Sequence, residues 1–292
     1  PQETRKTYNT INYALAILED KSIEEIAEEE KTEGREQLLK RYNSYKENKR
    51  IEFITFHQNY AYEDFIQGLR PRTTGKDSEG SLSFKLHDGL FRKIADNALA
   101  AYKEDQEAAG SQIADNYVII IDEINRANIS RVFGELITLI EEDKRYDQIS
   151  AMSARLPSGE IFEVSSNLYI IGTMNTADKS IALIDIALRR RFEFVRLYPD
   201  EALVKSDYQE LLKAINEKIC KEKGPDFQIG HAYFMERPGQ QFNLRDTMNK
   251  RVIPLLYEYF MNDGEMVKNI LESAGIKLQE KNGLYEFTPD RS

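Results

Sequence analysis

The chain has 292 residues, of which 41% are hydrophobic and 31% charged, and its formal net charge is −10. This length allows one large domain or two smaller ones, and the acidic balance argues against a broad nucleic-acid-binding surface. The single cysteine, Cys220, excludes an internal disulfide and a cysteine-based zinc site, which fits a reducing, cytoplasmic setting.

The first quarter of the chain predicts helices followed by a strand. Apolar residues at helical spacing predict a helix over residues 8–26, and the charged stretch 24–50 predicts exposed surface helices. The apolar run 51–57 has the length of a strand. Residues 62–69 then place apolar side chains on one helix face, and Pro71 helps to end that helix.

The next segment predicts a hairpin or insertion before a second strand. Residues 73–80 are polar and contain glycine, and residues 81–86 alternate as a short strand does. An alanine-rich helix is expected over 91–109. The β-branched run 117–121 is typical of a strand that is covered on both faces in a parallel sheet.

The middle of the chain repeats this order of strand and helix. We expect a helix capped by Ser130, a hairpin around the turn 157–159, and a strand over 168–171 that ends on polar residues. A helix over 181–191 and a last strand over 192–197 complete the pattern. No stretch approaches the ~18 apolar residues of a membrane span, and no signal peptide is recognisable, so we expect neither membrane insertion nor export.

Alternating strands and helices predict an α/β fold whose parallel strands are joined by right-handed crossovers. In such sheets ligands bind beyond the carboxyl ends of the strands. After residue 199 the pattern becomes helical almost throughout, with loops near 224 and 237–241. We therefore expect an α/β domain over 1–198 and a smaller helical domain over 199–292.

Two carboxylates, Asp122 and Glu123, follow directly on the apolar run 117–121. Such a pair suits nucleotide hydrolysis with Mg²⁺, because one carboxylate can hold the cation while the next orients or deprotonates the attacking water. The pair could equally be a strand end that meets solvent. Asn175, beyond the next apolar run, could contact both the γ-phosphate and that water, or could simply be a turn residue.

Three consecutive arginines, Arg189, Arg190 and Arg191, lie between a predicted helix and a predicted strand. A guanidinium group can stabilise the charge of a transferred phosphate, often from a neighbouring subunit. The alternative is a solvated helix terminus whose positive charges offset the helix dipole.

Four segments together closely resemble one protein family: FITFHQNYAYEDFIQGLRP, DEINRANISRVFGELITLIEEDKR, GTMNTADKSIALIDIALRRRFEF and IGHAYFM. They are similar to the AAA+ subunit of modified-cytosine restriction systems, the McrB type, in the dynein-related branch. The most specific element, MNTADKS, carries lysine where the family usually has arginine. The resemblance implies an AAA+ P-loop NTPase fold, in which a three-layer α/β domain with a parallel sheet precedes a smaller C-terminal α-helical lid. It also implies a ring, usually a hexamer, which hydrolyses GTP and powers a partner nuclease.

The resemblance also assigns roles to individual residues. It implies that Asp122 binds Mg²⁺, that Glu123 is the catalytic glutamate and that Asn175 is the sensor. It points to Arg190 and Arg191 as a pair that acts on the neighbouring subunit's nucleotide.

Three further positions follow from the same resemblance. Asp178 and Lys179 fall within the signature motif, where they would contact nucleotide. His231 falls where the lid approaches the nucleotide, although a lone histidine can also be purely structural.

The sequence departs from the family at its first residues. PQETRKTY aligns with the family's P-loop PPGTGKTY and keeps Thr4, Lys6 and Thr7, which suit phosphate and Mg²⁺. Glu3 and Arg5 replace two glycines whose positive φ lets backbone amides close on phosphates, and Glu3 adds negative charge there. The strand that feeds such a loop is missing from the sequence.

Three interpretations of this departure stay open: a truncated piece with altered first residues, a degenerate paralogue, or a loop that works by another route. We expect the isolated polypeptide to hydrolyse GTP very weakly.

Three functions compete. The first is the GTP-driven motor of a restriction complex that translocates DNA for a nuclease subunit and relies on a separate N-terminal domain to read DNA. The second is an ATP-driven remodelling protein, and the third is a ring or scaffold module that does not hydrolyse nucleotide.

Overall fold

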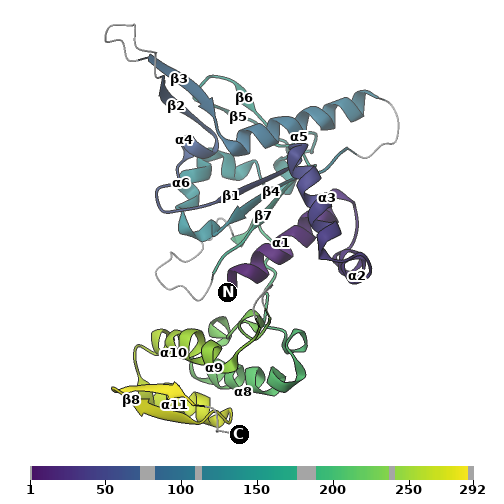
Figure 1. Cartoon of the computed structure of the whole chain (residues 1–292). Helices are drawn as coiled ribbons and strands as arrows, with labels where there is room; N and C mark the ends of the chain where they lie inside the picture. The colour runs from purple at the N-terminus through teal and green to yellow at the C-terminus, as the bar shows by residue number, and fades with distance from the viewer. Residues whose placement is uncertain (1, 73–82, 109–113, 176–188, 237–240, 289–292) are drawn as a thin grey trace, which may run out of the picture. The chain divides into compact units, whose positions relative to one another are not determined.

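The computed structural model describes residues 2–72, 83–108, 114–175, 189–236 and 241–288, and Figure 1 shows its elements. The chain divides into two compact units. The larger comprises Tyr8–Phe194, and the smaller comprises Val195–Ser292 together with the first seven residues.

A three-stranded parallel sheet lies at the centre of the larger unit (Figure 1). Its strands, in spatial order, are β1 (Ile51–Thr55), β4 (Tyr117–Asp122) and β7 (Leu168–Gly172). The register pairs Thr55 with Asp122 and Ile121 with Gly172, so the carboxyl ends of all three strands meet at one edge. The strands expected from the apolar runs are confirmed, and so is their parallel arrangement.

Helices cover both faces of this sheet, which makes the unit three-layered. Ile119 and Ile121 of β4 pack into a cluster with α5 (Leu90–Glu107) and α6 (Ile129–Phe133). Val118 and Ile120 face the other way, into a cluster with the helices α1 (Gln2–Leu18), α2 (Ile23–Glu33) and α3 (Arg35–Glu47). These four residues of β4 are all 0% exposed, which is why the strand is β-branched and apolar without alternation.

The expected first helix over 8–26 is interrupted in the structure. It ends at Leu18, and Ser22 then caps a new helix. The Ser22 hydroxyl accepts the Glu25 N–H at 3.1 Å, while the Glu25 carboxylate accepts the Ser22 N–H at 2.7 Å. This reciprocal capping box satisfies two amides at the helix start, so starting a new helix is stable here.

A hairpin takes the place of the longer helix expected over 62–69. Helix α4 spans only Tyr62–Phe65, and Leu69 lies in β2 (Gln67–Arg72), antiparallel to β3 (Ser83–Asp88). The chain can turn this sharply because Gly68 lacks a side chain. A Cβ there would lie 2.5 Å from the Cβ of Glu63. The expected strand near 81–86 is confirmed in β3.

The segment after β4 also differs in detail from expectation. Asn128, and not Ser130, caps α6: its side chain accepts the Arg131 N–H at 3.0 Å. Gly134, with φ 53°, ends this helix after five residues. Two 3₁₀ turns follow (Gly134–Thr138 and Glu142–Lys144), and the expected hairpin then forms from β5 (Ala154–Arg155) and β6 (Ile161–Phe162).

The last strand expected, over 192–197, does not form. No described strand pairs with this segment, and Phe194, Val195 and Leu197 are exposed. A strand-like sequence pattern does not form a strand unless another strand lies beside it to share backbone hydrogen bonds. The helix expected over 181–191 lies mostly outside the described residues.

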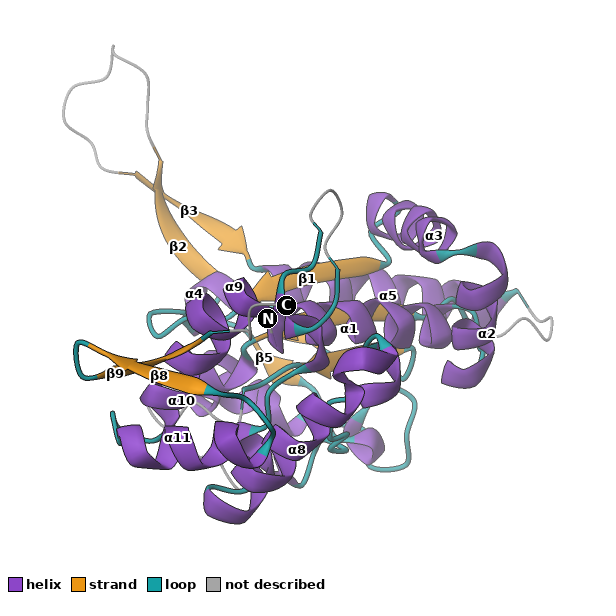
Figure 2. Cartoon of the chain, turned by 60° about the horizontal axis from the view of Figure 1, so that its bottom comes forward, coloured by secondary structure: helices purple, strands orange, loops and turns teal. Residues whose placement is uncertain are grey.

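The smaller unit is mainly helical (Figures 1 and 2). It has a hydrophobic core of its own. Its α-helices are α8 (Ser206–Glu222), α9 (Leu244–Thr247), α10 (Ile253–Tyr259) and α11 (Gly264–Ser273). Short helical turns span Glu201–Leu203, Pro225–Phe227, His231–Tyr233 and, in π form, Met248–Val252.

The unit closes with a hairpin of β8 (Leu278–Lys281) and β9 (Leu284–Phe287), whereas the pattern after residue 199 predicted helix almost throughout. Asn282 and Gly283, at φ 54° and 79°, form its turn. An Asn-Gly pair is the strongest short-range hairpin signal, so the sequence did contain this feature.

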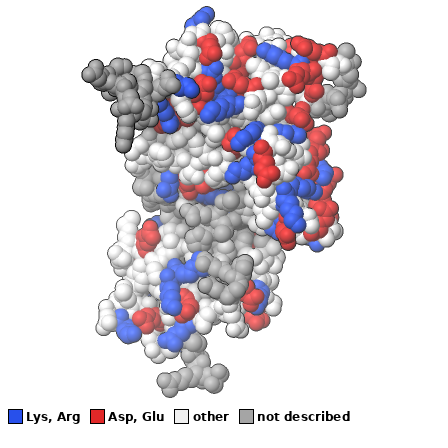
Figure 3. All heavy atoms as spheres, turned by 45° about the horizontal axis from the view of Figure 1, so that its top comes forward, with Lys and Arg blue, Asp and Glu red and all other residues white. Residues whose placement is uncertain are grey.

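On the face drawn in Figure 3, acidic and basic side chains are intermixed and form no continuous basic surface. Among the described residues, no helix is both long enough and apolar enough to cross a membrane.

Candidate active site

The carboxyl ends of β4 and β7 bring the acidic doublet and the expected sensor segment to one edge of the sheet. Asp122 is the last residue of β4, and Thr173 follows directly on β7. The Thr173 N–H donates to the carbonyl of Ile121 at 2.9 Å, and the Ile124 N–H donates to the carbonyl of Thr173 at 2.8 Å. The pairing of the strands thus extends past their ends into the loops that carry the polar residues.

The Thr173 side chain links both acidic residues. Its hydroxyl donates to Oδ1 of Asp122 and accepts the backbone N–H of Glu123 at 3.2 Å. Thr173 is only 8% exposed, so these bonds are shielded from competing water. Thr173 is one of the polar residues on which the expected strand 168–171 ends, and its role is visible only in the structure because only the paired strands show what it contacts.

Glu123 has an unusual backbone conformation. Its φ and ψ are 52° and 44°, in the left-handed region, which costs a residue with a side chain on the order of 1–2 kcal/mol. The residue is 7% exposed, and Nε of Arg126 lies 3.3 Å from its Oε2. Strained residues of this kind cluster at functional sites, where surrounding bonds hold them in place.

Two smaller features pack the ends of β4 and β7 together. A Cβ on Gly172 would lie 3.0 Å from Cδ1 of Ile124, so glycine gives the loop after β4 room to approach β7. The side-chain amide of Asn125 reaches the carbonyl of Asn175 at 3.5 Å. Asn175 is therefore held beside the loop that follows Glu123, and Asn125 is a further residue that sequence reasoning missed.

The residues at this edge fit Mg²⁺ held mainly by phosphate and water. The Asp122 carboxylate is partly exposed and offers the hard oxygen that Mg²⁺ prefers. No group of three or more His, Cys, Asp or Glu residues within the described part of the chain could form an all-protein metal cage. Mg²⁺ typically binds one or two carboxylates together with substrate phosphates, which matches this arrangement.

The arginines at 189–191 separate into two kinds. Arg189 and Arg190 are exposed, whereas Arg191 is partly buried and forms an ion pair with Glu141 of its own chain. Arg190 therefore has the accessibility that a contact with another subunit needs. In this structure Arg191 is engaged within its own subunit.

The N-terminal candidates lie in α1, which begins at Gln2 and runs without a break to Leu18. Thr4, Lys6 and Thr7 are thus in helical backbone, and Lys6 is partly buried. Glu3 and Arg5 are better helix formers than the glycines of a phosphate-binding loop, which accounts for the helical start. Asp178 and Lys179 lie outside the described residues.

His231 belongs to the smaller unit, where it is 6% exposed. Its Nδ1 accepts the backbone N–H of Asp200 at 3.1 Å, so it ties the start of the helical unit to the turn His231–Tyr233. This contact gives the histidine a structural role within its own unit.

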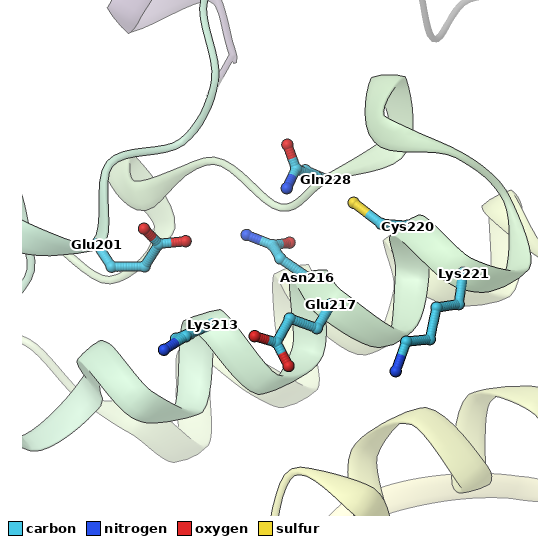
Figure 4. A pocket seen from close by; sticks show the side chains of 7 residues that line it. All are labelled: Glu201, Lys213, Asn216, Glu217, Cys220, Lys221 and Gln228. Carbon is cyan, nitrogen blue, oxygen red and sulfur yellow. The ribbon is translucent and has the colours of Figure 1, made fainter.

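A shallow pocket of about 450 Å³ lies beside α8 in the smaller unit (Figure 4). Its lining mixes acidic, basic and amide side chains from Glu201, Lys213, Asn216, Glu217, Cys220, Lys221 and Gln228. Burial raises the pKa of the Cys220 thiol, which keeps that thiol protonated and unreactive at neutral pH. The Asn216 side chain is already bonded to Ile229 through both its donor and its acceptor.

Comparison with known families matches two parts of the chain. Residues 31–192 match the AAA domain of the dynein-related subfamily, which is more than half of the chain. Residues 207–268 match the alpha-helical lid domain of McrB.

Two curated bacterial proteins are similar in sequence. The type IV methyl-directed restriction enzyme EcoKMcrB subunit of Escherichia coli K12 is 38% identical over 240 residues, which cover 73% of this chain and 48% of that protein. The type II restriction enzyme BsuMI component YdiS of Bacillus subtilis 168 is 27% identical over 158 residues, which cover 48% of this chain and 46% of that protein. The chain therefore spans about half the length of these relatives.

Proposed function

Because the chain belongs to the dynein-related AAA family and has a lid of the McrB type, we propose that it is the nucleotide-hydrolysing motor subunit of a modification-dependent DNA restriction system. The observation that best supports hydrolysis is the hydrogen-bonded edge formed by Asp122, Glu123 and Thr173. We favour GTP over ATP as the substrate and Mg²⁺ as the cofactor.

Each residue at the sheet edge has a defined task in this proposal. Asp122 would hold Mg²⁺, with Thr7 of the N-terminal segment as a second ligand, and Glu123 would accept a proton from the attacking water. The Asn175 amide orients that water and the γ-phosphate. Bound Mg²⁺ supplies positive charge that offsets the charge of the transferred phosphoryl group.

The remaining assignments concern contacts with phosphate and with other subunits. Lys6 and Thr4 would bind the phosphates, and Asp178, Lys179 and His231 would contact nucleotide. Arg190 acts on the nucleotide of the neighbouring subunit, in a ring that we propose to be a hexamer. Arg191, now paired with Glu141, would join it only after that ion pair breaks.

We propose that the ring powers a separate nuclease subunit and moves DNA, with recognition of modified bases in a further domain. The similar E. coli protein is a methyl-directed restriction enzyme subunit, which supports this class of system. An ATP-driven remodelling protein remains the alternative motor, and the choice of nucleotide separates the two.

A second function, a ring or scaffold module without hydrolysis, is favoured by one specific observation. Residues that align with a P-loop are helical from Gln2, and glutamate and arginine stand at positions 3 and 5. Residues in helical backbone have negative φ and so lack the positive-φ conformation by which a glycine loop closes its amides on phosphate.

A turnover assay decides between these functions. It compares GTP and ATP hydrolysis by the full chain with that of Glu123→Gln and of Glu142→Gln, a matched change at an exposed glutamate. For a motor we expect Glu123→Gln to reduce the rate constant about 10²–10⁴-fold, because a positioned base is lost, with Glu142→Gln unchanged.

The same assay on the double variant Glu3→Gly, Arg5→Gly tests the first residues. We expect weak hydrolysis in the parent chain and an increase in this variant. Equal rates for the parent, the glycine variant and Glu123→Gln would instead establish the scaffold function.

A further inference from the structure

We propose that Thr173 is a positioning residue that fixes both acidic groups of the active site through a single hydroxyl. This inference rests on the proposed function, since it explains how the metal ligand and the general base are held. The evidence is geometric and lies in the bonds between the end of β7 and the end of β4.

The hydroxyl of Thr173 takes part in a directed chain of hydrogen bonds. The Glu123 N–H donates to Thr173 Oγ1 at 3.2 Å, and Oγ1–H donates to Oδ1 of Asp122. A hydroxyl has one proton and accepts through its lone pairs, so it can serve both partners at once. A methyl group of the same size could serve neither.

The position of this hydroxyl is itself fixed by backbone bonds. Thr173 N–H donates to Ile121 at 2.9 Å and its carbonyl accepts from Ile124 at 2.8 Å. The β-branched side chain, moreover, has few allowed rotamers. The oxygen is therefore held at a defined place between the two acidic residues.

The bond to Glu123 has a particular consequence because that residue is in the left-handed region. A buried amide needs a partner, and the Thr173 hydroxyl is the acceptor that this conformation reaches. Without it, the turn that directs the Glu123 carboxylate loses a bond that offsets its backbone strain. The bond to Asp122 likewise fixes one oxygen of the carboxylate that would hold the metal.

Two substitutions separate the hydroxyl from the rest of the side chain. Thr173→Val keeps the shape and removes the hydroxyl, whereas Thr173→Ser keeps the hydroxyl and removes the methyl group. Thr55→Val is the matched control, because Thr55 is exposed at the end of the neighbouring strand β1 and pairs in register with Asp122.

The first measurement is Mn²⁺ affinity by electron paramagnetic resonance, in the full chain with a non-hydrolysable GTP analogue. Since groups that orient metal ligands typically contribute 10–100-fold to affinity, we expect Thr173→Val to weaken Mn²⁺ binding at least about tenfold. Thr173→Ser and Thr55→Val should stay near the parent value. An unchanged affinity in Thr173→Val, or an equal loss in the serine variant, overturns the proposal.

The second measurement needs neither metal nor nucleotide and so separates this inference from the proposed function. Amide hydrogen exchange should accelerate at Glu123 in Thr173→Val, at least about tenfold, because its acceptor is gone. Exchange at Ile124 should not change, since that amide bonds to the Thr173 backbone carbonyl, which every variant retains.

If the parent chain binds neither Mn²⁺ nor nucleotide, the proposed function fails. The rate of amide hydrogen exchange at Glu123 then decides by itself whether Thr173 is a positioning residue. Equal exchange at Glu123 in the parent and Thr173→Val rejects it. Acceleration at both amides would indicate general loosening and would also reject it.

Discussion

At the scale of single residues, Arg145 shows how a charged side chain can organise a segment by donating to backbone carbonyls. Its guanidinium donates to the carbonyls of Ile140, Ser165 and Leu168 at 2.8–3.1 Å. Burial lowers the pKa of this arginine to about 10, which still leaves it charged at neutral pH. The residue thus fixes the start of β7, the strand that leads to Thr173 and Asn175.

We expect Arg145→Met to destabilise the larger unit by about 3 kcal/mol, because three carbonyls lose a charged donor in a shielded site. Urea unfolding followed by circular dichroism measures this change. Arg155→Met is the control, since Arg155 is exposed and contacts one carbonyl, that of Gly159 at 2.8 Å, and should change stability by less than about 0.5 kcal/mol. Equal effects of the two substitutions would contradict the role given to Arg145.

At the scale of elements, the hairpin β2–β3 interrupts what the sequence pattern presents as a helical segment. Gly89, at the start of α5, lets the chain after β3 come back against the end of α4. A Cβ there would lie 2.2 Å from the carbonyl carbon and oxygen of Phe65. Its N–H also donates to the carbonyl of Ile66 at 2.8 Å. The chain therefore closes the hairpin by bringing two backbones into contact.

Gly89→Ala should cost about 3 kcal/mol or more, because backbone atoms cannot move aside as a flexible side chain can. The measurement is the shift of the thermal or urea midpoint. Gly230→Ala provides the comparison: a Cβ there meets nothing within 4 Å, so we expect a change within about 0.5 kcal/mol. A midpoint for Gly89→Ala close to that of the parent would show that this contact is not as tight as described.

At the scale of the whole molecule, the two units have separate hydrophobic cores. The cluster of the helical unit contains only residues between Val204 and Phe287, and the clusters around the sheet contain none of them. Units with their own cores can unfold independently.

We expect Leu256→Ala, at a lid position that is 0% exposed, to destabilise the lid by about 2–5 kcal/mol without affecting the sheet. Hydrogen exchange resolved by peptide should accelerate across α8–α11 and remain unchanged in β4. Phe133→Ala, in the core beside the sheet, is the reciprocal variant and should show the reverse pattern. Acceleration in both units for either variant would show that they unfold together.

The sequence by itself determined the class of fold and the edge of the sheet at which the candidate site residues meet. Uninterrupted β-branched runs identified the buried parallel strands, and polar residues at their ends marked the edge of the sheet, because these signals are local along the chain. It also identified the family, through motifs whose residues are close in sequence.

Only the tertiary structure decided which partners those residues have. The link from Thr173 to Asp122 and Glu123 spans about fifty positions and exists because β4 and β7 pair in one register. The hairpin at 67–88 and the missing strand at 192–197 depend likewise on what lies beside them. The spacing of apolar residues shows which face of a helix or strand is apolar. It does not show which distant segment packs against that face, because this depends on the tertiary structure.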